Sequence, residues 1–147
     1  MDSSLELQVK LVRPGAQMPA RQSALASGFD LHACLDGGTI EVGTTPVLVP
    51  TGVAIAAPVG ADVQIRPRSG LSSRGVISTF GTIDADYRGE LFVTMYCLPP
   101  VGRYVIEDGE RIAQLVVGRL ADVTWTVVND LDRTSRGNSG HGSTGRS

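Results

Sequence analysis

The chain is built from short segments in which apolar and polar residues alternate, separated by turn-forming residues. A strand with one buried face has this period of two. The segments with strand character are residues 5–11, 47–49, 53–56, 61–66, 90–97, 111–117 and 123–128. No long stripe at the helical period of 3.6 is present, and the one helix we expect is short, over about Ser69–Arg74. With 18 Gly and 8 Pro residues available for turns, this pattern predicts an all-β barrel or jelly roll.

The length of 147 residues is that of a single domain, and a hydrophobic content of 41% allows a buried core. Aromatic residues make up only 5%, so we expect a core of Val, Leu, Ile and Ala. We expect the β domain to occupy residues 1–130. Residues 131–147 are rich in Gly and Ser and cannot bury enough apolar area to order themselves. They should form a flexible C-terminal arm.

Charge and composition exclude several classes of protein. The net charge is −2 and there is no basic stripe, which argues against polynucleotide binding as the main task. No apolar run approaches the length of a transmembrane helix and no signal peptide is evident, so we expect a cytoplasmic protein without a membrane partner. Cys34 and Cys97 lack a CxxC spacing and are expected to be small buried hydrophobes, with a disulfide between them as the open alternative.

Residues 81–91 (GTIDADYRGEL) carry the most informative chemistry. Apolar residues at 76–77 and 91–93 predict the two strands of a tight hairpin around them. In an extended chain Asp84 and Asp86 would share one face, whereas a turn between them would splay them apart. An enclosed carboxylate can take a proton from water, as hydrolases require, but acidic hairpin tips are also common as plain solvated turns.

Four further segments accompany residues 81–91. They are residues 27–31 (SGFDL), 66–72 (RPRSGLS), 109–115 (GERIAQL) and 136–145 (RGNSGHGSTG). In chain order, the five segments resemble the five motifs of the trimeric dUTPase family, the dUTP diphosphatases. The resemblance spans residues 23–145, and it implies a distorted jelly roll that hydrolyses dUTP to dUMP and diphosphate. This activity limits uracil incorporation into DNA and supplies dUMP for dTMP synthesis.

The resemblance assigns selectivity to the third motif. In the family its backbone reads the edge of uracil, and the matching positions here are Thr82, Ile83 and the return strand at Phe92. Tyr87 would lie under the deoxyribose and reject a ribose 2′-OH by steric clash. Ser78 stands where many members carry Asn, and residues 72–80 form a shorter segment than in cellular-type members. Both differences bear on the floor of the uracil pocket.

The resemblance also assigns the groups around the phosphates. Asp84 would be the general base, a role typically worth about 10²–10⁴-fold in rate. Gln114 would contact the α-phosphate and the attacking water, and Asp30 would approach the metal only indirectly, through water. The metal implied is Mg²⁺, held by the triphosphate and by waters. The Arg68-Ser69-Gly70 segment suits an anion pocket, although Ser69 could equally cap the short helix.

The fifth motif lies in the C-terminal arm. By resemblance Arg136 and the Ser143–Thr144 region would bind the phosphates, with Gly142 giving the backbone freedom to close over them. His141 stands where many members have a Phe that stacks on the base, and an imidazole can also stack. The alternative is that the arm is a plain flexible terminus.

The resemblance implies a homotrimer whose three active sites each combine motifs from different subunits. Two functions other than dUTP hydrolysis remain open at this point. A dCTP deaminase shares the fold but needs a Glu seven residues after the hairpin aromatic, where this chain has Thr94. The other alternative is a regulatory protein on a dUTPase scaffold. The retention of Asp84, Tyr87, Arg68 and Gln114 argues against it.

Overall fold

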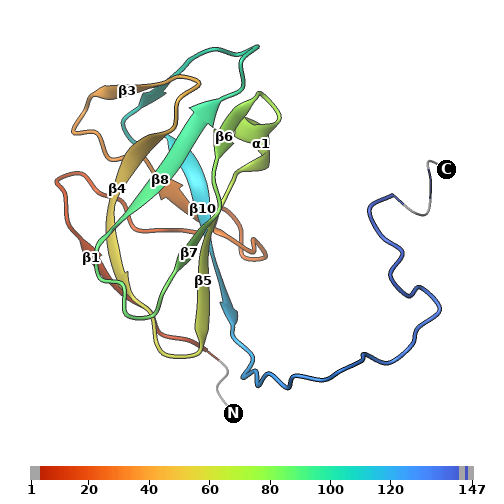
Figure 1. Cartoon of the computed structure of the whole chain (residues 1–147). Helices are drawn as coiled ribbons and strands as arrows, with labels where there is room; N and C mark the ends of the chain where they lie inside the picture. Colours follow the sequence, from red (N-terminus) through yellow and green to blue (C-terminus); the bar gives the residue numbers. More distant parts are fainter. Residues whose placement is uncertain (1–3, 143–144, 146–147) are drawn as a thin grey trace.

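The computed structural model describes residues 4–142 and Gly145, and shows a β-sheet domain followed by a long extended segment (Figure 1). Within this described part the only helix is α1 (Ser69–Ser72). The strands are β1 (Gln8–Leu11), β2 (Phe29–His32), β3 (Thr39–Val42), β4 (Val47–Ala56), β5 (Ala61–Arg66), β6 (Val76–Ser78), β7 (Gly81–Ile83), β8 (Glu90–Cys97), β9 (Tyr104–Glu107) and β10 (Arg111–Arg119).

Two four-stranded antiparallel sheets enclose one core. The first has the order β1-β4-β8-β6 and the second β2-β10-β5-β7, while β3 and β9 form a two-stranded ribbon. The inward-facing residues of both sheets belong to a single cluster, with Val93 and Met95 from β8, Leu31 from β2 and Ile112 from β10 almost fully buried. The buried apolar residues include no aromatic ring in the described chain, as the composition predicted. The all-β prediction is confirmed.

The clearest alternating segments folded as their pattern predicted. Residues 61–66 and 90–97 are strands β5 and β8 over those same bounds, and both alternate between buried and more exposed positions. Residues 47–49 and 53–56 are not two pieces but one strand, β4, with an irregular register between Pro50 and Ala54. Pro50 has no N–H to donate, and the Thr51 hydroxyl instead donates to the carbonyl of Leu91 at 2.6 Å.

Three local expectations were wrong. Residues 5–7 are not part of β1, although Leu5 and Leu7 pack against the core. The helix ends at Ser72 rather than Arg74, and it is followed by a turn at Gly75, which has a positive φ of 78°. Residues 123–128, all of them described, form no strand, because no other segment of the chain lies beside them to supply ladder hydrogen bonds.

Cys34 and Cys97 are buried and both are free thiols, so the disulfide alternative does not hold. Burial raises the pKa of both thiols. No helix in the described part of the chain has the length and apolar character needed to cross a membrane.

Candidate active site

Three of the sequence-predicted residues meet in what we call the arginine corner, which consists of Asp30, Arg68, Arg111 and Gln114. The register of the second sheet places Gln114 of β10 directly between Asp30 of β2 and Arg66 of β5. Arg68 follows β5 by two residues and its guanidinium donates to the carbonyl of Arg111 at 3.0 Å. The Gln114 amide donates to the carbonyl of Pro67 at 2.9 Å, which ties the second motif to the fourth.

The corner carries more positive than negative charge. Asp30 is buried, and its carboxylate lies 3.4 Å from the Arg111 guanidinium and 3.8 Å from that of Arg68. Two guanidinium groups therefore face one carboxylate, and both remain partly exposed. Forked guanidinium donors beside open solvent suit a phosphate chain. Arg111 was not among the predicted site residues, although it lies within the fourth motif.

Two backbone features shape the corner. Gly28 is required beside Gln114, because a Cβ there would come within 2.1 Å of the Gln114 side-chain oxygen. Helix α1 begins directly after Arg68, which is its N-cap and makes no side-chain capping bond. Ser69 is the first helical residue rather than the cap, so the capping alternative is wrong. Ser69 and Gly70 are exposed next to Arg68.

The third motif does not form a tight hairpin, contrary to expectation. Strand β6 pairs with the far end of β8, with Val76 opposite Cys97 and Ser78 opposite Met95. The chain then crosses to the second sheet, where β7 pairs with β5 and forms the sheet edge. The two arms thus belong to different sheets from residue 81 onward, and β7 forms no ladder with the first half of β8.

Among the described residues, the first half of β8 has no partner strand on the side that faces away from β4. The carbonyl of Thr94 accepts from the Thr79 amide on the β6 side of the strand, and that of Leu91 accepts from Thr51 on the β4 side. Since backbone groups alternate in direction along a strand, the N–H and C=O of Phe92 face the same side as those of Thr94. In the described chain no strand pairs with that side of Phe92.

The other predicted uracil contacts lie on β7 and β6. Thr82 and Ile83 are on the edge strand β7, opposite Gln64 and Val63 of β5. Ser78 on β6 is buried, and its hydroxyl donates to the carbonyl of Ile112 at 2.7 Å. The Ser78 hydroxyl is therefore already bonded to β10 within the chain.

Asp84 and Tyr87 share a turn at the tip of the third motif. The amide of Tyr87 donates to the carbonyl of Asp84 at 3.0 Å, so the segment is a turn and not an extended strand. The Tyr87 hydroxyl donates to the carbonyl of Glu90 at 2.8 Å. Asp84 and Asp86 are both exposed. Within one chain Asp84 is not enclosed, as a general base in a hydrolase site has to be.

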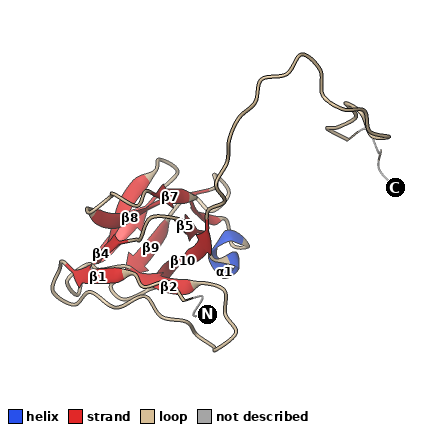
Figure 2. Cartoon of the chain, turned by 90° about the horizontal axis from the view of Figure 1, so that it is seen from below, coloured by secondary structure: helices blue, strands red, loops and turns tan. Residues whose placement is uncertain are grey.

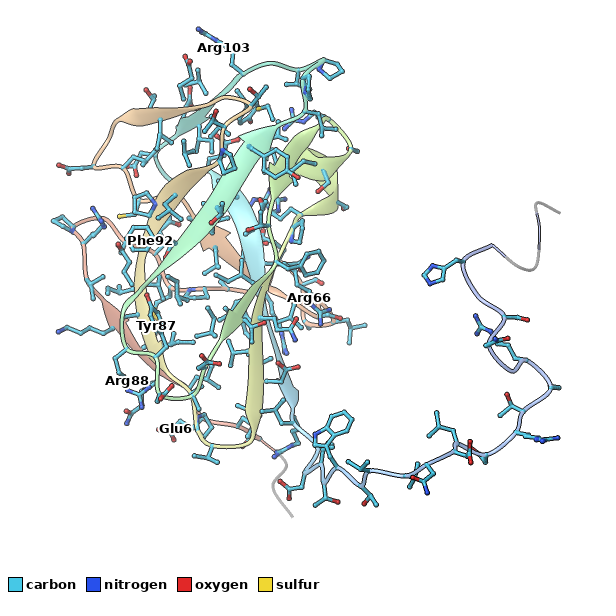
Figure 3. The ribbon with its side chains drawn as sticks, in the orientation of Figure 1. Glu6, Arg66, Tyr87, Arg88, Phe92 and Arg103 are labelled. Atoms are coloured by element: carbon cyan, nitrogen blue, oxygen red, sulfur yellow. The ribbon has the colours of Figure 1, made fainter. Side chains whose placement is uncertain are left out.

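Asp84 and the arginine corner lie far apart in one chain. On β5 the corner is level with Arg66, whereas Asp84 continues β7 to the level of Asp62. Those four residues of strand correspond to about 13 Å along the sheet. Tyr87 and Arg66 are accordingly well separated in Figure 3. The predicted general base and the predicted phosphate-binding groups of one chain are therefore too far apart to act on the same bond.

The predicted residues of the arm lie away from both regions. From Leu120 onward the chain runs out from the sheets, as Figures 1 and 2 both show. Arg136 donates to the carbonyl of Ser139 at 2.9 Å, a contact within the arm itself. His141 and Gly142 are exposed, and both have positive φ angles, of 50° and 87°. The predicted residues Ser143 and Thr144 lie outside the described part of the chain.

The described residues contain no group of three or more His, Cys, Asp or Glu side chains that could hold a metal ion. Asp30 is the one carboxylate of the arginine corner, and arginines engage both of its oxygens. These residues therefore offer no free direct ligand, and a cation such as Mg²⁺ would have to be held there by substrate phosphates and its own waters.

Fold and site together define a two-sheet β protein with a positively charged corner and, in the described chain, an unpaired stretch of backbone at the start of β8. Such a corner suits a phosphorylated ligand. The dUTPase family profile matches residues 15–145, and the chain belongs to the dUTPase family.

Relatives in bacteria support this membership over nearly the full length. The chain is 41% identical to a deoxyuridine 5′-triphosphate nucleotidohydrolase of Leptospira interrogans, with 96% of this chain and 99% of that protein covered. Identity to the proteins of the same name is 45% in Treponema pallidum (92% and 94% covered) and 48% in Desulfotalea psychrophila (87% and 87% covered). Neither the deaminase nor the purely regulatory alternative is favoured by these matches.

Solved structures share the fold. The dUTPase of Staphylococcus bacteriophage 80alpha with dUpNHpp superimposes with a TM-score of 0.81 at 29% identity, covering 96% of this chain and 99% of that one. A dUTPase variant from phage phi11 of S. aureus has a TM-score of 0.74 at 24% identity, covering 85% and 97%. The distorted jelly roll of the dUTPase type is thereby confirmed.

Proposed function

We propose that the protein hydrolyses dUTP to dUMP and diphosphate in the cytoplasm. The observation that carries the proposal is the unpaired backbone at Phe92 of β8, together with Asp84 and Tyr87 on the turn that joins β7 to β8. Relatives named deoxyuridine triphosphate nucleotidohydrolases, at 41–48% identity, point to the same substrate. The two free cysteines fit a reducing compartment.

Unpaired backbone groups of β8 would select uracil. The N–H and C=O of Phe92 have no partner strand within the described residues, and the edge strand β7 would contribute Thr82 and Ile83 from the other side. A fixed peptide donor and acceptor fit uracil's edge and mismatch that of cytosine, whose exocyclic group is a donor where uracil has an acceptor. A pocket narrow enough for a bare C5–H would exclude the thymine methyl group.

Hydrolysis would begin with water attacking the α-phosphorus of dUTP. Asp84 takes the proton of this water as general base, and Gln114 orients the water and the α-phosphate. The new oxygen–phosphorus bond forms as the bond between the α-phosphorus and its bridging oxygen breaks, so that diphosphate leaves. The guanidinium groups of Arg68 and Arg111 stabilise charge on the departing group. Mg²⁺, bound through the triphosphate and waters near Asp30, would supply further charge neutralisation there. The relative from phage phi11 is described with a structural Mg(II) ion.

A homotrimer with composite sites would resolve the separation between Asp84 and the arginine corner. One copy would supply Asp30, Arg68 and Gln114, and a second copy would bring its Asp84 loop beside them. The exposed fractions of Trp125 and Val127 are 92% and 97%, which is an unfavourable state for large apolar side chains in water. Another copy would cover them. A mostly apolar hollow of about 550 Å³, lined in part by Leu7, Val9, Met18 and Phe29, offers a surface of matching character.

The arm would come from the third copy. In the described chain, residues 131–142 form hydrogen bonds only within the arm. None of these bonds ties the arm to the β domain of the same chain. Closing over a bound triphosphate would place Arg136 on the phosphates and the His141 ring against the base. Lids of this kind exclude water from the reacting bond.

The proposal is tested by measuring diphosphate release with Mg²⁺ from dUTP, dCTP, dTTP and UTP side by side, with ammonia monitored. Release from dUTP alone is the expected result. Ammonia from dCTP would reassign the reaction to deamination, and a lack of turnover with all four nucleotides would refute the proposed activity.

A further inference from the structure

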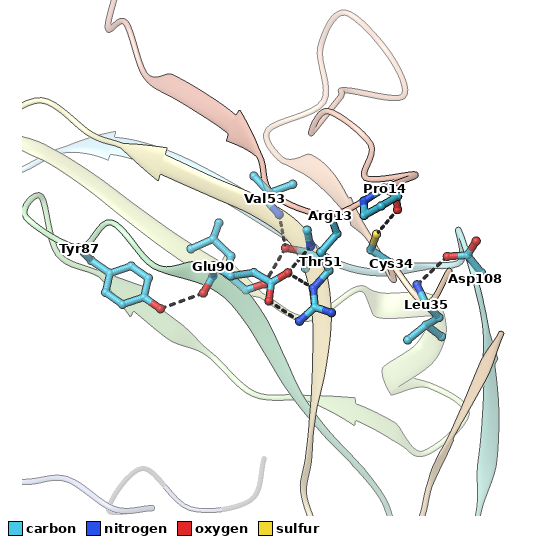
Figure 4. A network of polar contacts seen from close by, with 11 residues as sticks. Arg13, Pro14, Cys34, Leu35, Thr51, Val53, Tyr87, Glu90 and Asp108 are labelled. Carbon is cyan, nitrogen blue, oxygen red and sulfur yellow. Dashed lines mark hydrogen bonds and ion pairs between the residues drawn. The ribbon is translucent and has the colours of Figure 1, made fainter. Parts of the chain in front are cut away.

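The loop that carries Asp84 and Tyr87 is attached to Arg13, a residue outside every motif discussed so far. Figure 4 shows the contacts. The Arg13 guanidinium binds the Glu90 carboxylate through two N–H donors. Its Nε donates to Oε1, and its Nη2 donates to Oε2 at 2.9 Å. The amide of Gly52 also donates to Glu90 Oε1, at 3.0 Å. Both carboxylate oxygens of Glu90 are therefore bonded, one of them twice.

Glu90 in turn holds Tyr87. The carbonyl of Glu90 accepts the hydrogen bond of the Tyr87 hydroxyl at 2.8 Å. The phenol end of the ring lies over Gly89, where an added Cβ would come within 2.5 Å of the hydroxyl oxygen. The position of the Tyr87 ring is thus set by the Glu90 peptide group, and the turn bond from the Tyr87 amide passes this constraint to Asp84.

We propose that Arg13 and Glu90 are positioning residues that hold the Tyr87 ring in place, and that they thereby set the discrimination between deoxyribose and ribose. The inference rests on the proposed dUTP hydrolysis. The Tyr87 ring can exclude a ribose 2′-OH sterically only if the ring is held firmly in position. A bidentate guanidinium–carboxylate pair has the directional rigidity for this; the Glu90 side chain is 11% exposed and that of Arg13 is 44% exposed.

The variant Arg13→Ala should raise the ratio of kcat/KM for UTP over that for dUTP by about ten-fold, mostly through better use of UTP. Lys offers a point charge without the fork, so Arg13→Lys should restore part of the discrimination. The matched control is Arg103→Ala. Arg103 pairs with Glu41 at 3.2 Å on the β3–β9 ribbon, with both side chains more than half exposed, and its removal should leave the ratio unchanged.

A double-mutant cycle with Tyr87→Phe separates positioning from general destabilisation. If Arg13 acts through the bond from the Tyr87 hydroxyl to Glu90, the ratio should respond to Arg13→Ala much less in the Tyr87→Phe background than in the wild type. Equal responses in the two backgrounds would overturn the proposal.

Hydrogen exchange of the amides of residues 84–90 supplies a readout that does not depend on turnover. Faster exchange in Arg13→Ala and Glu90→Gln, but not in Arg103→Ala, is expected. Unchanged exchange would overturn the anchoring role, and faster exchange with an unchanged UTP/dUTP ratio would overturn the role in specificity. Absence of dUTP hydrolysis by the wild type would refute the proposed function instead, and exchange would still decide whether Arg13 anchors the loop.

Discussion

The arginine corner and the loop that carries Asp84 are completed to different degrees within one chain. The corner joins three neighbouring strands, and its side chains are bonded to one another or to nearby carbonyls. The Asp84 loop is well hydrogen-bonded where it joins β8. The Asp84 carboxylate is nevertheless exposed and lies about 13 Å along the sheet from the corner. The comparison supports the proposal that one chain prepares two half-sites, each of which another copy would complete.

The largest expected effect concerns the loop. Asp84→Asn should lower kcat for dUTP by about 10²–10⁴-fold, because the amide cannot accept the proton of the attacking water. Affinity for a non-hydrolysable dUTP analogue should stay close to that of the wild type, as measured by calorimetry. Wild-type turnover in this variant would show that another group is the base.

Removal of the arm should have the next largest effect. Truncation after Asp132 should leave a folded protein with the wild-type oligomeric state, since residues 133–142 form no backbone hydrogen bond with the sheets. Its kcat/KM for dUTP should fall by about 10²-fold, the size expected when a closing segment that orients the substrate is lost. Turnover combined with light scattering makes the test, and full activity would exclude the arm from the site.

The arginine corner should respond mainly in substrate binding. Arg68→Ala removes a forked donor for the phosphates, and a hydrogen bond to a charged group is worth about 1.5–3 kcal/mol, so KM for dUTP should rise by at least about ten-fold. The exposed Arg103→Ala serves as the matched loss of one arginine. A fall in kcat at unchanged KM would assign Arg68 to the transition state alone.

The smallest effect concerns His32, which follows Asp30 and Leu31 on β2. Burial is the main cause that lowers the pKa of His32 below its ordinary value of 6.5, with Arg111 and Arg68 adding to it and Asp30 opposing it. The unfolded chain therefore binds this proton at a higher pH than the folded one, so the free energy of unfolding should decrease as pH falls below about 6.5. Urea unfolding from about pH 7 to about pH 5 measures the slope, and His32→Gln should flatten it. An unchanged slope would show that other groups cause it.

Sequence patterns predicted the strands reliably where the alternation within one strand is enough to specify its buried face. The alternation in residues 61–66 and 90–97 specifies which face is buried, and both strands formed as predicted. The corner residues Asp30, Arg68 and Gln114 lie together although they belong to three separate motifs.

The misses share a physical cause, which is pairing over long sequence distances. Residues 123–128 have a strand pattern, but a pattern cannot say which chain supplies the neighbouring strand. The hairpin expected around residues 81–91 opened because β7 pairs with β5 instead of β8. Arg13 and Glu90 are 77 residues apart, and no local signal connects them.

A subunit-mixing experiment tests the composite site most directly. Asp84→Asn has an intact arm but no base, and the chain truncated after Asp132 has the base but no arm. After dissociation and reassembly of the two together, mixed oligomers should hydrolyse dUTP well above either parent, because one copy supplies the base and another the arm. Mixed oligomers, verified by mass spectrometry, that remain as inactive as the parents would show that each chain serves its own site and would contradict the account.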